Sequence, residues 1–306
     1  MIVIVCPGQG SQTPGFLAPW VAESRFRDQL AGISDAVGID LLAHGTTSDA
    51  DTIRDTAIAQ PLIVAAGLVT LSALLANGRR ERIAGIAGHS VGEVTAAAGA
   101  GILSETDAVS FVRERGAAMA EAAALEPTGM SAVIGADETE LLRRLDELGL
   151  SPANYNGGGQ VVVAGALDAL ALLAANPPER ARVIPLQVAG AFHTRYMQPA
   201  ADRLTSFAAV LPVSDPTLQI WTNSDGTVVE SGRLFVDLMV GQVSSPVRWD
   251  LCMDAFAASG VTGLVELAPA GALTGLAKRG LKGVPTVAIK TPDDLPAAFE
   301  LIDQQS

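Results

Sequence analysis

The chain of 306 residues is 49% apolar, has 17% charged residues and carries a formal net charge of -13. This composition predicts a globular protein with one large core and room for a smaller second one. The acidic balance argues against nucleic acid as a partner, because neutralising phosphates requires clustered Lys and Arg. Two cysteines, Cys6 and Cys252, provide neither a disulfide framework nor a metal-ligand spacing. We therefore expect a cytoplasmic protein without a metal site.

The first ten residues, MIVIVCPGQG, predict a β-strand followed by a glycine-rich loop. A signal peptide has a basic stretch before its apolar run, and these residues have none. Residues 58–76 carry no charge, but polar residues such as Gln60 and Thr70 interrupt them. A helix from Pro61 to Ala76 would reach roughly 24 Å, which is short of the hydrocarbon core of a membrane. We therefore expect no membrane span, and a buried core helix with Pro61 at its first position.

Residues 88–92 match the pattern G-x-S-x-G, with Ser90 at its centre. The pattern alone is weak in a chain with 31 glycines, and an ordinary turn would also explain it. Its neighbours make it more specific, because an apolar strand (83–87) precedes it and a helix-forming segment (93–98) follows it. A sharp strand-to-helix turn exposes the serine hydroxyl above the sheet edge, next to a helix N-terminus that favours negative charge. We therefore interpret Ser90 as a nucleophile.

Residues 1–125 alternate apolar strands with Ala- and Leu-rich helices, which is typical of an α/β domain with a covered parallel sheet. The pattern then changes to β-α-β-β-α-β, in the ranges 130–134, 137–148, 153–156, 160–164, 167–175 and 182–187. This order predicts a ferredoxin-like subdomain. Strands at 218–222 and 264–267 alternate with helices again. We therefore expect a large α/β-hydrolase-like domain of residues 1–125 and 191–306, with an inserted ferredoxin-like subdomain of residues 126–190.

A serine nucleophile needs a base, and the chain has three histidines, at 44, 89 and 193. His89 directly precedes Ser90, so its side chain should diverge from the serine and pack instead. His44 fits the last turn of a helix. His193 lies in a small-residue loop after the inserted subdomain, where side chains of two domains can meet across a cleft. We expect His193 to be the base, oriented by a backbone carbonyl or an amide, because no Asp or Glu stands near it in sequence.

Residues 107–121 predict a helix that carries an arginine on an apolar face. In this helix Arg115 shares its face with Phe111, Val112, Ala118 and Met119. A charged group in such a setting needs a partner, which is either a structural carboxylate or an anionic ligand. The sequence leaves both alternatives open.

A series of motifs resembles, in order, those of malonyl-CoA:acyl carrier protein transacylases. The motifs are Pro7-Gly8-Gln9-Gly10-Ser11-Gln12, Gly88-His89-Ser90-Val91-Gly92-Glu93, Arg115-Gly116 with Met119, Ala191-Phe192-His193-Thr194, Gln242 with Pro246-Val247-Arg248-Trp249, and Leu273-Thr274-Gly275-Leu276 with Lys278-Arg279. The resemblance spans nearly the whole chain, and an ordered series is more specific than any single motif. Two positions depart from the family pattern: Cys6 stands where a bulky apolar residue is common, and Ala270 follows Pro269 where glycine is usual.

The resemblance implies acyl transfer through a serine ester. Ser90, activated by His193, would attack the malonyl thioester and keep the malonyl group while CoA leaves. Backbone N–H groups of Gln9 and Val91 would hold the oxyanion. Gln242 would orient the His193 ring through its backbone carbonyl.

The resemblance also implies how the acyl group is selected. Arg115 would bind the free malonyl carboxylate with two parallel hydrogen bonds, next to Met119 in the substrate pocket. Phe192, which precedes the histidine, is an aromatic residue typical of malonyl-specific members. Two alternatives remain: an acyltransferase for another acyl-CoA such as methylmalonyl-CoA, and a serine esterase or thioesterase. The esterase would have no need of a buried arginine.

The implied partners are a coenzyme A thioester and an acyl carrier protein, whose phosphopantetheine thiol takes the acyl group in a second half-reaction. The resemblance implies no cofactor, and we expect a monomer. Carrier proteins of this type are acidic, so docking on a chain of net charge -13 needs a local basic patch. Residues 79–82, Arg195 and the pair Lys278 and Arg279 are the candidates.

Overall fold

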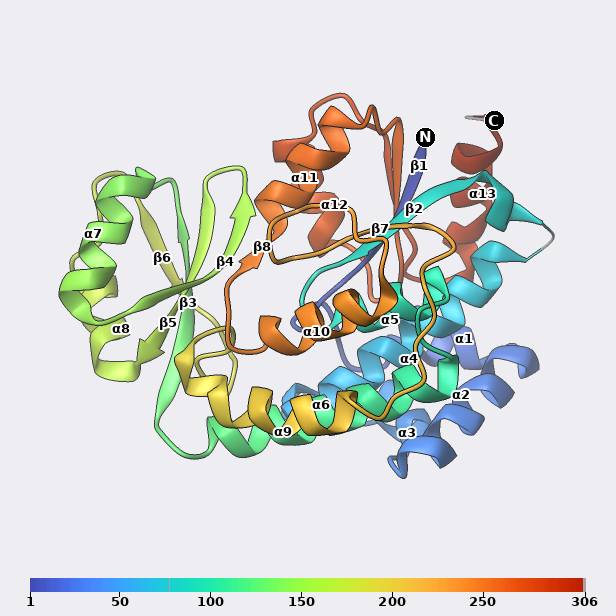
Figure 1. Ribbon diagram of the computed structural model, residues 1–306, viewed down its shortest axis with the longest axis horizontal. Helices are drawn as coiled ribbons and strands as arrows, with labels where there is room; N and C mark the ends of the chain where they lie inside the picture. Colours follow the sequence, from blue (N-terminus) through green and yellow to red (C-terminus); the bar gives the residue numbers. More distant parts are fainter. Residues whose placement is uncertain (77, 305–306) are drawn as a thin grey trace.

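A parallel sheet of five strands forms the centre of the large domain in the computed structural model, which describes residues 1–76 and 78–304 (Figure 1). Residues 77, 305 and 306, which the expected domain ranges include, lie outside the described residues. The strand order is β10-β9-β1-β2-β7, and every neighbouring pair is parallel. The strands are β1 (Ile2–Cys6), β2 (Ile83–Gly88), β7 (Gln219–Trp221), β9 (Gly263–Glu266) and β10 (Thr286–Ala288).

Helices cover both faces of this sheet. The longer ones are α2 (Ser24–Val37), α4 (Thr56–Leu75), α5 (Gly92–Ala100), α6 (Glu105–Ala123), α9 (Gln198–Ala208), α10 (Gly232–Gln242), α11 (Trp249–Ala258), α12 (Ala272–Gly280) and α13 (Leu295–Gln304). Short helices are α1 (Ala18–Val21), α3 (Leu41–Thr46), η1 (Thr52–Arg54), η2 (Arg79–Arg82), η3 (Arg195–Met197) and η4 (Pro292–Asp294).

The side chains of β1 point alternately to the two faces of the sheet, so this one strand contributes to two apolar clusters. Ile2, Ile4 and Cys6 belong to one apolar cluster, together with residues of α4, α5 and α6. Val3 and Val5 belong to a second cluster, together with residues of α11 and α12. Successive side chains of a strand point to opposite faces, so an entirely apolar strand is buried on both. The predicted α/β architecture with a covered parallel sheet is therefore confirmed.

Helix α4 is long and apolar enough to cross a membrane, but 83% of its most apolar window is buried inside the protein. It is a core helix, as the sequence predicts. The expectation that it begins at Pro61 was wrong. It begins at Thr56, because the Asp55 carboxylate caps its first turn by accepting a hydrogen bond from Ala57 N at 2.8 Å. Pro61 lies inside the helix, where its missing N–H leaves one backbone hydrogen bond unmade.

The second sheet lies at one end of the molecule (Figure 1). Its elements are β3 (Thr128–Ile134), α7 (Glu138–Leu148), β4 (Ser151–Gly157), β5 (Gln160–Ala166), α8 (Leu167–Ala175) and β6 (Arg182–Pro185). The antiparallel order β6-β3-β5-β4 confirms the predicted ferredoxin-like arrangement. A further strand, β8 (Val247–Arg248), pairs in parallel with β4. This strand comes from beyond the inserted segment and joins the second sheet to the large domain.

The two faces of the second sheet have different functions. Leu141 of α7 and Leu173 of α8 pack in one apolar cluster with Val133 and Val163 of the sheet. Met130 and Ala132, which alternate with Val133 along β3, line a cavity on the other face. The helices therefore cover one face and leave the other turned toward the large domain.

Two glycines allow a tight turn between β2 and α5. A Cβ on Gly88 would lie 2.0 Å from the carbonyl carbon of Gly92, and a Cβ on Gly92 would lie 2.1 Å from the carbonyl oxygen of Cys6. Both obstacles are backbone atoms, which cannot rotate away as a flexible side chain could. The close approach of β1, β2 and α5 therefore depends on glycine at these positions.

Replacing one of these glycines should destabilise the fold by overpacking. We expect Gly92→Ala to lower the free energy of unfolding by about 2–3 kcal/mol. Gly32→Ala in α2 is the matched control, since a Cβ there meets nothing within 4 Å. That change should raise stability by roughly 0.5–1 kcal/mol, because alanine is the better helix former. Urea denaturation measures both, and equal midpoints for the two variants would contradict this account of the turn.

Candidate active site

Ser90 occupies the tip of the turn between β2 and α5, at the carboxyl end of the parallel sheet. Its φ is 54°, in the left-handed region that residues other than glycine rarely adopt. Among the described residues only Arg180 and His193 share this property without being glycine, with φ values of 62° and 61°. Strained backbone is concentrated at functional sites, where the surrounding structure maintains it. The two residues expected to form the catalytic pair are both in this conformation.

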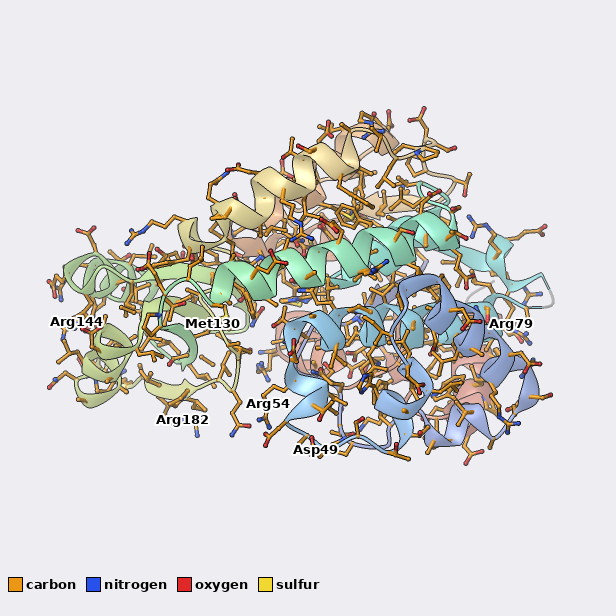
Figure 2. All side chains as sticks on the ribbon, turned by 90° about the horizontal axis from the view of Figure 1, so that it is seen from below. Asp49, Arg54, Arg79, Met130, Arg144 and Arg182 are labelled. Atoms are coloured by element: carbon orange, nitrogen blue, oxygen red, sulfur yellow. The ribbon has the colours of Figure 1, made fainter. Side chains whose placement is uncertain are left out.

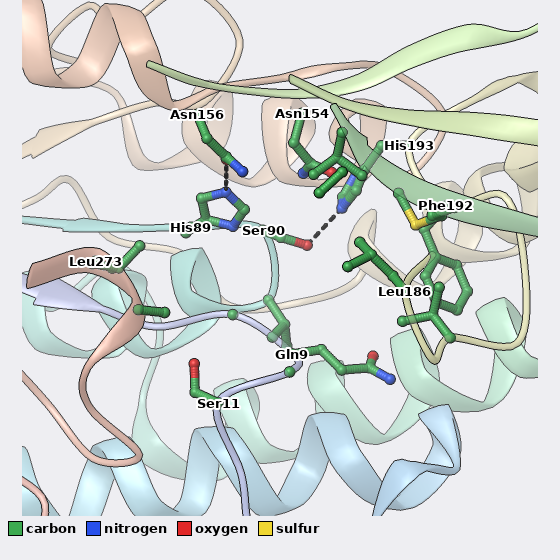
Figure 3. A pocket seen from close by; sticks show the side chains of 18 of the residues that line it. Gln9, Ser11, His89, Ser90, Asn154, Asn156, Leu186, Phe192, His193 and Leu273 are labelled. Atoms are coloured by element: carbon green, nitrogen blue, oxygen red, sulfur yellow. Dashed lines mark hydrogen bonds between the residues drawn. The ribbon is translucent and has the colours of Figure 1, made fainter. Parts of the chain in front are cut away.

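The structure brings Ser90 and His193 into direct contact (Figure 3). Ser90 Oγ lies 2.7 Å from His193 Nε2. On the other side of the ring, His193 Nδ1 lies 2.8 Å from the backbone carbonyl oxygen of Gln242. A carbonyl can only accept, so Nδ1 carries the proton and Nε2 is left to accept from the serine hydroxyl. Gln242 thus occupies the position expected for the residue that orients the histidine.

The environment of His193 favours its neutral form. The residue is 4% exposed, and burial together with the Arg115 charge lowers the pKa of its imidazole to about 3. An unprotonated Nε2 beside a hydroxyl is the state that a general base requires.

The other two histidines lie where the sequence places them. His89 Nε2 donates to Asn156 Oδ1 at 2.9 Å (Figure 3). The His89 ring also packs edge-on against Trp249, with ring centroids 5.7 Å apart. His89 therefore ties the turn before Ser90 to β4 of the second sheet. His44 lies in the last turn of α3, and its Nδ1 is 3.0 Å from Ser48 Oγ.

Arg115 is 1% exposed and its guanidinium points at the catalytic pair. Its Nη1 donates to Gln60 Oε1 at 2.6 Å, and its Nη2 donates to Gln242 Oε1 at 3.0 Å and to Ser90 Oγ at 3.3 Å. In the described part of the chain no carboxylate lies within 4.0 Å of it. Burial lowers the pKa of Arg115 to about 10, and the nearby Glu93 opposes this shift. The group stays cationic at neutral pH, and its contacts favour the anionic-ligand alternative over the structural salt bridge.

Sequence reasoning missed three polar residues beneath the site. Asn223 Oδ1 accepts from Ser90 N at 2.8 Å, Glu93 bonds to both Asn223 and Gln242, and Gln60 bonds to Arg115. Burial raises the pKa of the Glu93 carboxyl, and the N–H donors at both oxygens and the Arg115 charge oppose this shift. Both oxygens accept from N–H groups, and no acceptor among the described residues is placed to take a carboxyl proton, so these contacts hold Glu93 in its ionised form. Glu93 stands within the serine motif, which was a signal available in the sequence. Asn223 follows β7, and only the strand order places it beside β2.

A cavity of about 560 Å³ opens in front of Ser90, between the edge of the parallel sheet and the open face of the second sheet (Figure 3). The expected site residues Gln9, Val91, Met119 and Phe192 all line it. In the described residues the backbone N–H groups of Gln9 and Val91 have no acceptor, so both are free for a ligand oxygen. The cavity therefore combines a nucleophile, a base, unused N–H donors and a buried cation.

Comparison with known proteins agrees with this geometry. Residues 3–293 match the family described as acyl transferase domain. The malonyl CoA-acyl carrier protein transacylase of Mycobacterium tuberculosis is 51% identical over 299 residues, which cover 96% of this chain and 98% of the relative. The crystal structure of MCAT from Mycobacterium tuberculosis has a TM-score of 0.94 at 49% identity, and covers 97% of this chain and 99% of its own.

A further solved structure is a type II PKS acyl-carrier protein in complex with its malonyl-transacylase. It has a TM-score of 0.91 at 30% identity, and the match covers 98% of this chain and 99% of that one. Since sequence and fold both match over nearly the whole length, the chain belongs to the acyltransferase family, within the group of malonyl CoA-acyl carrier protein transacylases.

Proposed function

We propose that this protein transfers a malonyl group from malonyl-CoA to the phosphopantetheine thiol of an acyl carrier protein, through a malonyl ester on Ser90. The reactions named for its relatives support this function. The observation that carries the proposal is the buried Arg115 guanidinium, which lies 3.3 Å from Ser90 Oγ and has no carboxylate partner among residues 1–76 and 78–304. A free carboxylate on the acyl group would complete its hydrogen bonds.

In the first half-reaction His193 Nε2 takes the proton of Ser90 Oγ as the serine attacks the thioester carbonyl. The N–H groups of Gln9 and Val91 stabilise the negative charge that develops on the carbonyl oxygen. The tetrahedral intermediate then collapses, the C–S bond breaks, and the CoA sulfur leaves with the proton from His193. The product is malonyl-Ser90 with His193 neutral again.

In the second half-reaction the phosphopantetheine thiol gives its proton to His193 and attacks the Ser90 ester. Collapse breaks the ester C–O bond and returns the proton to Ser90 Oγ. Both steps use the same imidazole and the same oxyanion donors, as a ping-pong transfer requires. The mechanism uses no cofactor. One chain supplies every residue of the site, so a monomer suffices, and we place the reaction in the cytoplasm.

Arg115 gives the site its preference for an anionic acyl group. A guanidinium can hold a carboxylate with two parallel hydrogen bonds, and such bonds are strong where water is excluded. A neutral acyl group would instead leave the buried cation without an anion. Met119, which is 1% exposed, and Phe192, which is 5% exposed, line the same cavity and limit the size of the acyl group.

The carrier protein should dock at the mouth of the cavity. Arg279 lines it, and the adjacent Lys278 is exposed on α12. Residues 79–82 are less suited, because they precede β2 whereas Ser90 follows it, which places them at opposite edges of the sheet. In Figure 2 Arg79 lies far from Met130, which lines the cavity. Arg79 and Arg82 also pair with Asp303.

Removing the arginine should change which acyl group is accepted. We expect Arg115→Ala to raise the activation free energy of malonyl transfer by about 2–5 kcal/mol, because a buried charge-assisted contact is lost. Acetyl-CoA should become the relatively better substrate. Intact-protein mass spectrometry of the acyl-enzyme measures both, with Ser90→Ala as the control that forms no adduct. If both substrates slowed equally, Arg115 would have a structural role.

The low pKa of His193 predicts the pH dependence of acylation. The neutral imidazole is the active form, and burial and the Arg115 charge lower its pKa from 6.5 to about 3. The value of kcat/KM for malonyl-CoA, which reports on the free enzyme, should therefore stay constant as the pH falls from about 8 to about 5. Measuring CoA release across this range tests it. A loss of activity with a midpoint near 6.5 would show that His193 titrates as an ordinary histidine.

A further inference from the structure

Glu93 is a buried carboxylate that the proposed mechanism does not use. It lies in the first turn of α5, three residues after the nucleophile, and is 1% exposed. Its Oε1 accepts from the backbone N–H of Asn223 at 2.6 Å, and its Oε2 accepts from Gln242 Nε2 at 2.5 Å. Both oxygens face donors, an arrangement suited to an ionised carboxylate, which can only accept.

The contacts of Gln242 show what this carboxylate accomplishes. One end of the Gln242 amide, Nε2, donates to Glu93 and also to Asn223 Oδ1 at 2.9 Å. The other end, Oε1, accepts from Arg115 Nη2 at 3.0 Å. If the amide were reversed, its oxygen would face two acceptors and its NH₂ group would face a guanidinium that only donates. The orientation of the amide is therefore set by the acceptors on one side and by Arg115 on the other.

Asn223 is held in the same way. Its Nδ2 donates to the carbonyl oxygen of Gly88 at 2.8 Å, which turns its Oδ1 toward Ser90 N and Gln242 Nε2. Its backbone N–H is held by Glu93. The Glu93 carboxylate thus bonds to both residues that hold the nucleophile, the arginine and the base, whereas it makes no hydrogen bond to these three itself. Only the backbone N–H of Glu93 reaches one of them, donating to the carbonyl oxygen of Ser90 at 3.0 Å as part of the turn.

We propose that Glu93 is a positioning residue, which fixes the amide of Gln242 and through it the guanidinium that receives the acyl carboxylate. The inference rests on the proposed function, since it concerns how the same site recognises its substrate. An acceptor at position 93 keeps Gln242 Oε1 turned toward Arg115 Nη2. With Gln60 on Nη1, this holds the guanidinium fork facing Ser90.

The isosteric variant Glu93→Gln tests this role. Its amide keeps the shape of the side chain but places an NH₂ donor against either Asn223 N or Gln242 Nε2. Two donors repel each other there, so the Gln242 amide shifts and its contact with Arg115 Nη2 is weakened. We expect the ratio of malonyl to acetyl acylation of Ser90 to fall by roughly 10- to 100-fold, because a misplaced binding group loses its two parallel bonds. Competition between malonyl-CoA and acetyl-CoA, read by intact-protein mass spectrometry, gives the ratio directly.

The opposite result would overturn the proposal. Removing a negative charge near Arg115 favours an anionic substrate if charge alone matters, so the ratio would then rise. An unchanged ratio would also overturn it, because a purely structural role slows both substrates alike. Glu93→Asp provides the second variant and the alternative if Glu93→Gln does not fold. It keeps the charge on a shorter side chain that cannot reach both donors, so the ratio should again fall, and a wild-type ratio would contradict positioning.

Glu266 offers a matched control. It is 0% exposed, and its two oxygens accept from the backbone N–H groups of Leu273 and Thr274 at 2.9 and 2.8 Å. Glu266→Gln should lower the thermal unfolding temperature without changing the malonyl-to-acetyl ratio. In the same experiment, the wild-type protein separates the proposed malonyl transfer from the proposed positioning role of Glu93. If it takes up no malonyl group at Ser90, the proposed function fails, whereas selective wild-type acylation with an unchanged Glu93→Gln ratio defeats only the positioning role.

Discussion

A positive charge buried beside the nucleophile is the constraint on which the site depends. Transferring a guanidinium out of water is costly unless its donors are satisfied. Here neutral amide oxygens supply the partners, Gln60 from α4 and Gln242 from α10, around Arg115 of α6. A carboxylate in direct contact would satisfy the charge permanently and leave nothing for a substrate. Amide partners hold the group in place and keep its charge available for the anionic end of the acyl group.

The parallel sheet explains how residues far apart in sequence form one site. The carboxyl ends of β1, β2 and β7 lie at the same edge, so the segments that follow them bring Gln9, Ser90 and Asn223 together. The second sheet closes the cavity from the other side, and β8 joins it to the large domain. The hydrogen bond between His89 and Asn156 links the two parts next to the nucleophile. The cleft between two sheets is thus as important for the function as the turn that carries the serine.

Much of this arrangement is encoded in local sequence. The strand-turn-helix around Ser90, the β-α-β-β-α-β order and the apolar face of Arg115 each follow from short-range patterns, and the structure has all three. The prediction that α4 begins at Pro61 was wrong, because Asp55 caps the helix and its first residue is Thr56, five residues before the proline. Asn223 and Gln60 could not be found in this way. Their roles depend on which strands and helices become neighbours, and a polar residue in a buried segment gives no sign of its distant partner.

The structure of the acyl-enzyme trapped after reaction with malonyl-CoA tests the central claim most directly. The account predicts a malonyl ester on Ser90 Oγ, with its free carboxylate bonded to the Arg115 guanidinium and its ester carbonyl oxygen near the N–H groups of Gln9 and Val91. Gln60 and Gln242 should keep their contacts with the arginine. A malonyl carboxylate turned toward solvent, with Arg115 bonded only to the protein, would contradict the claim that this buried charge selects the substrate.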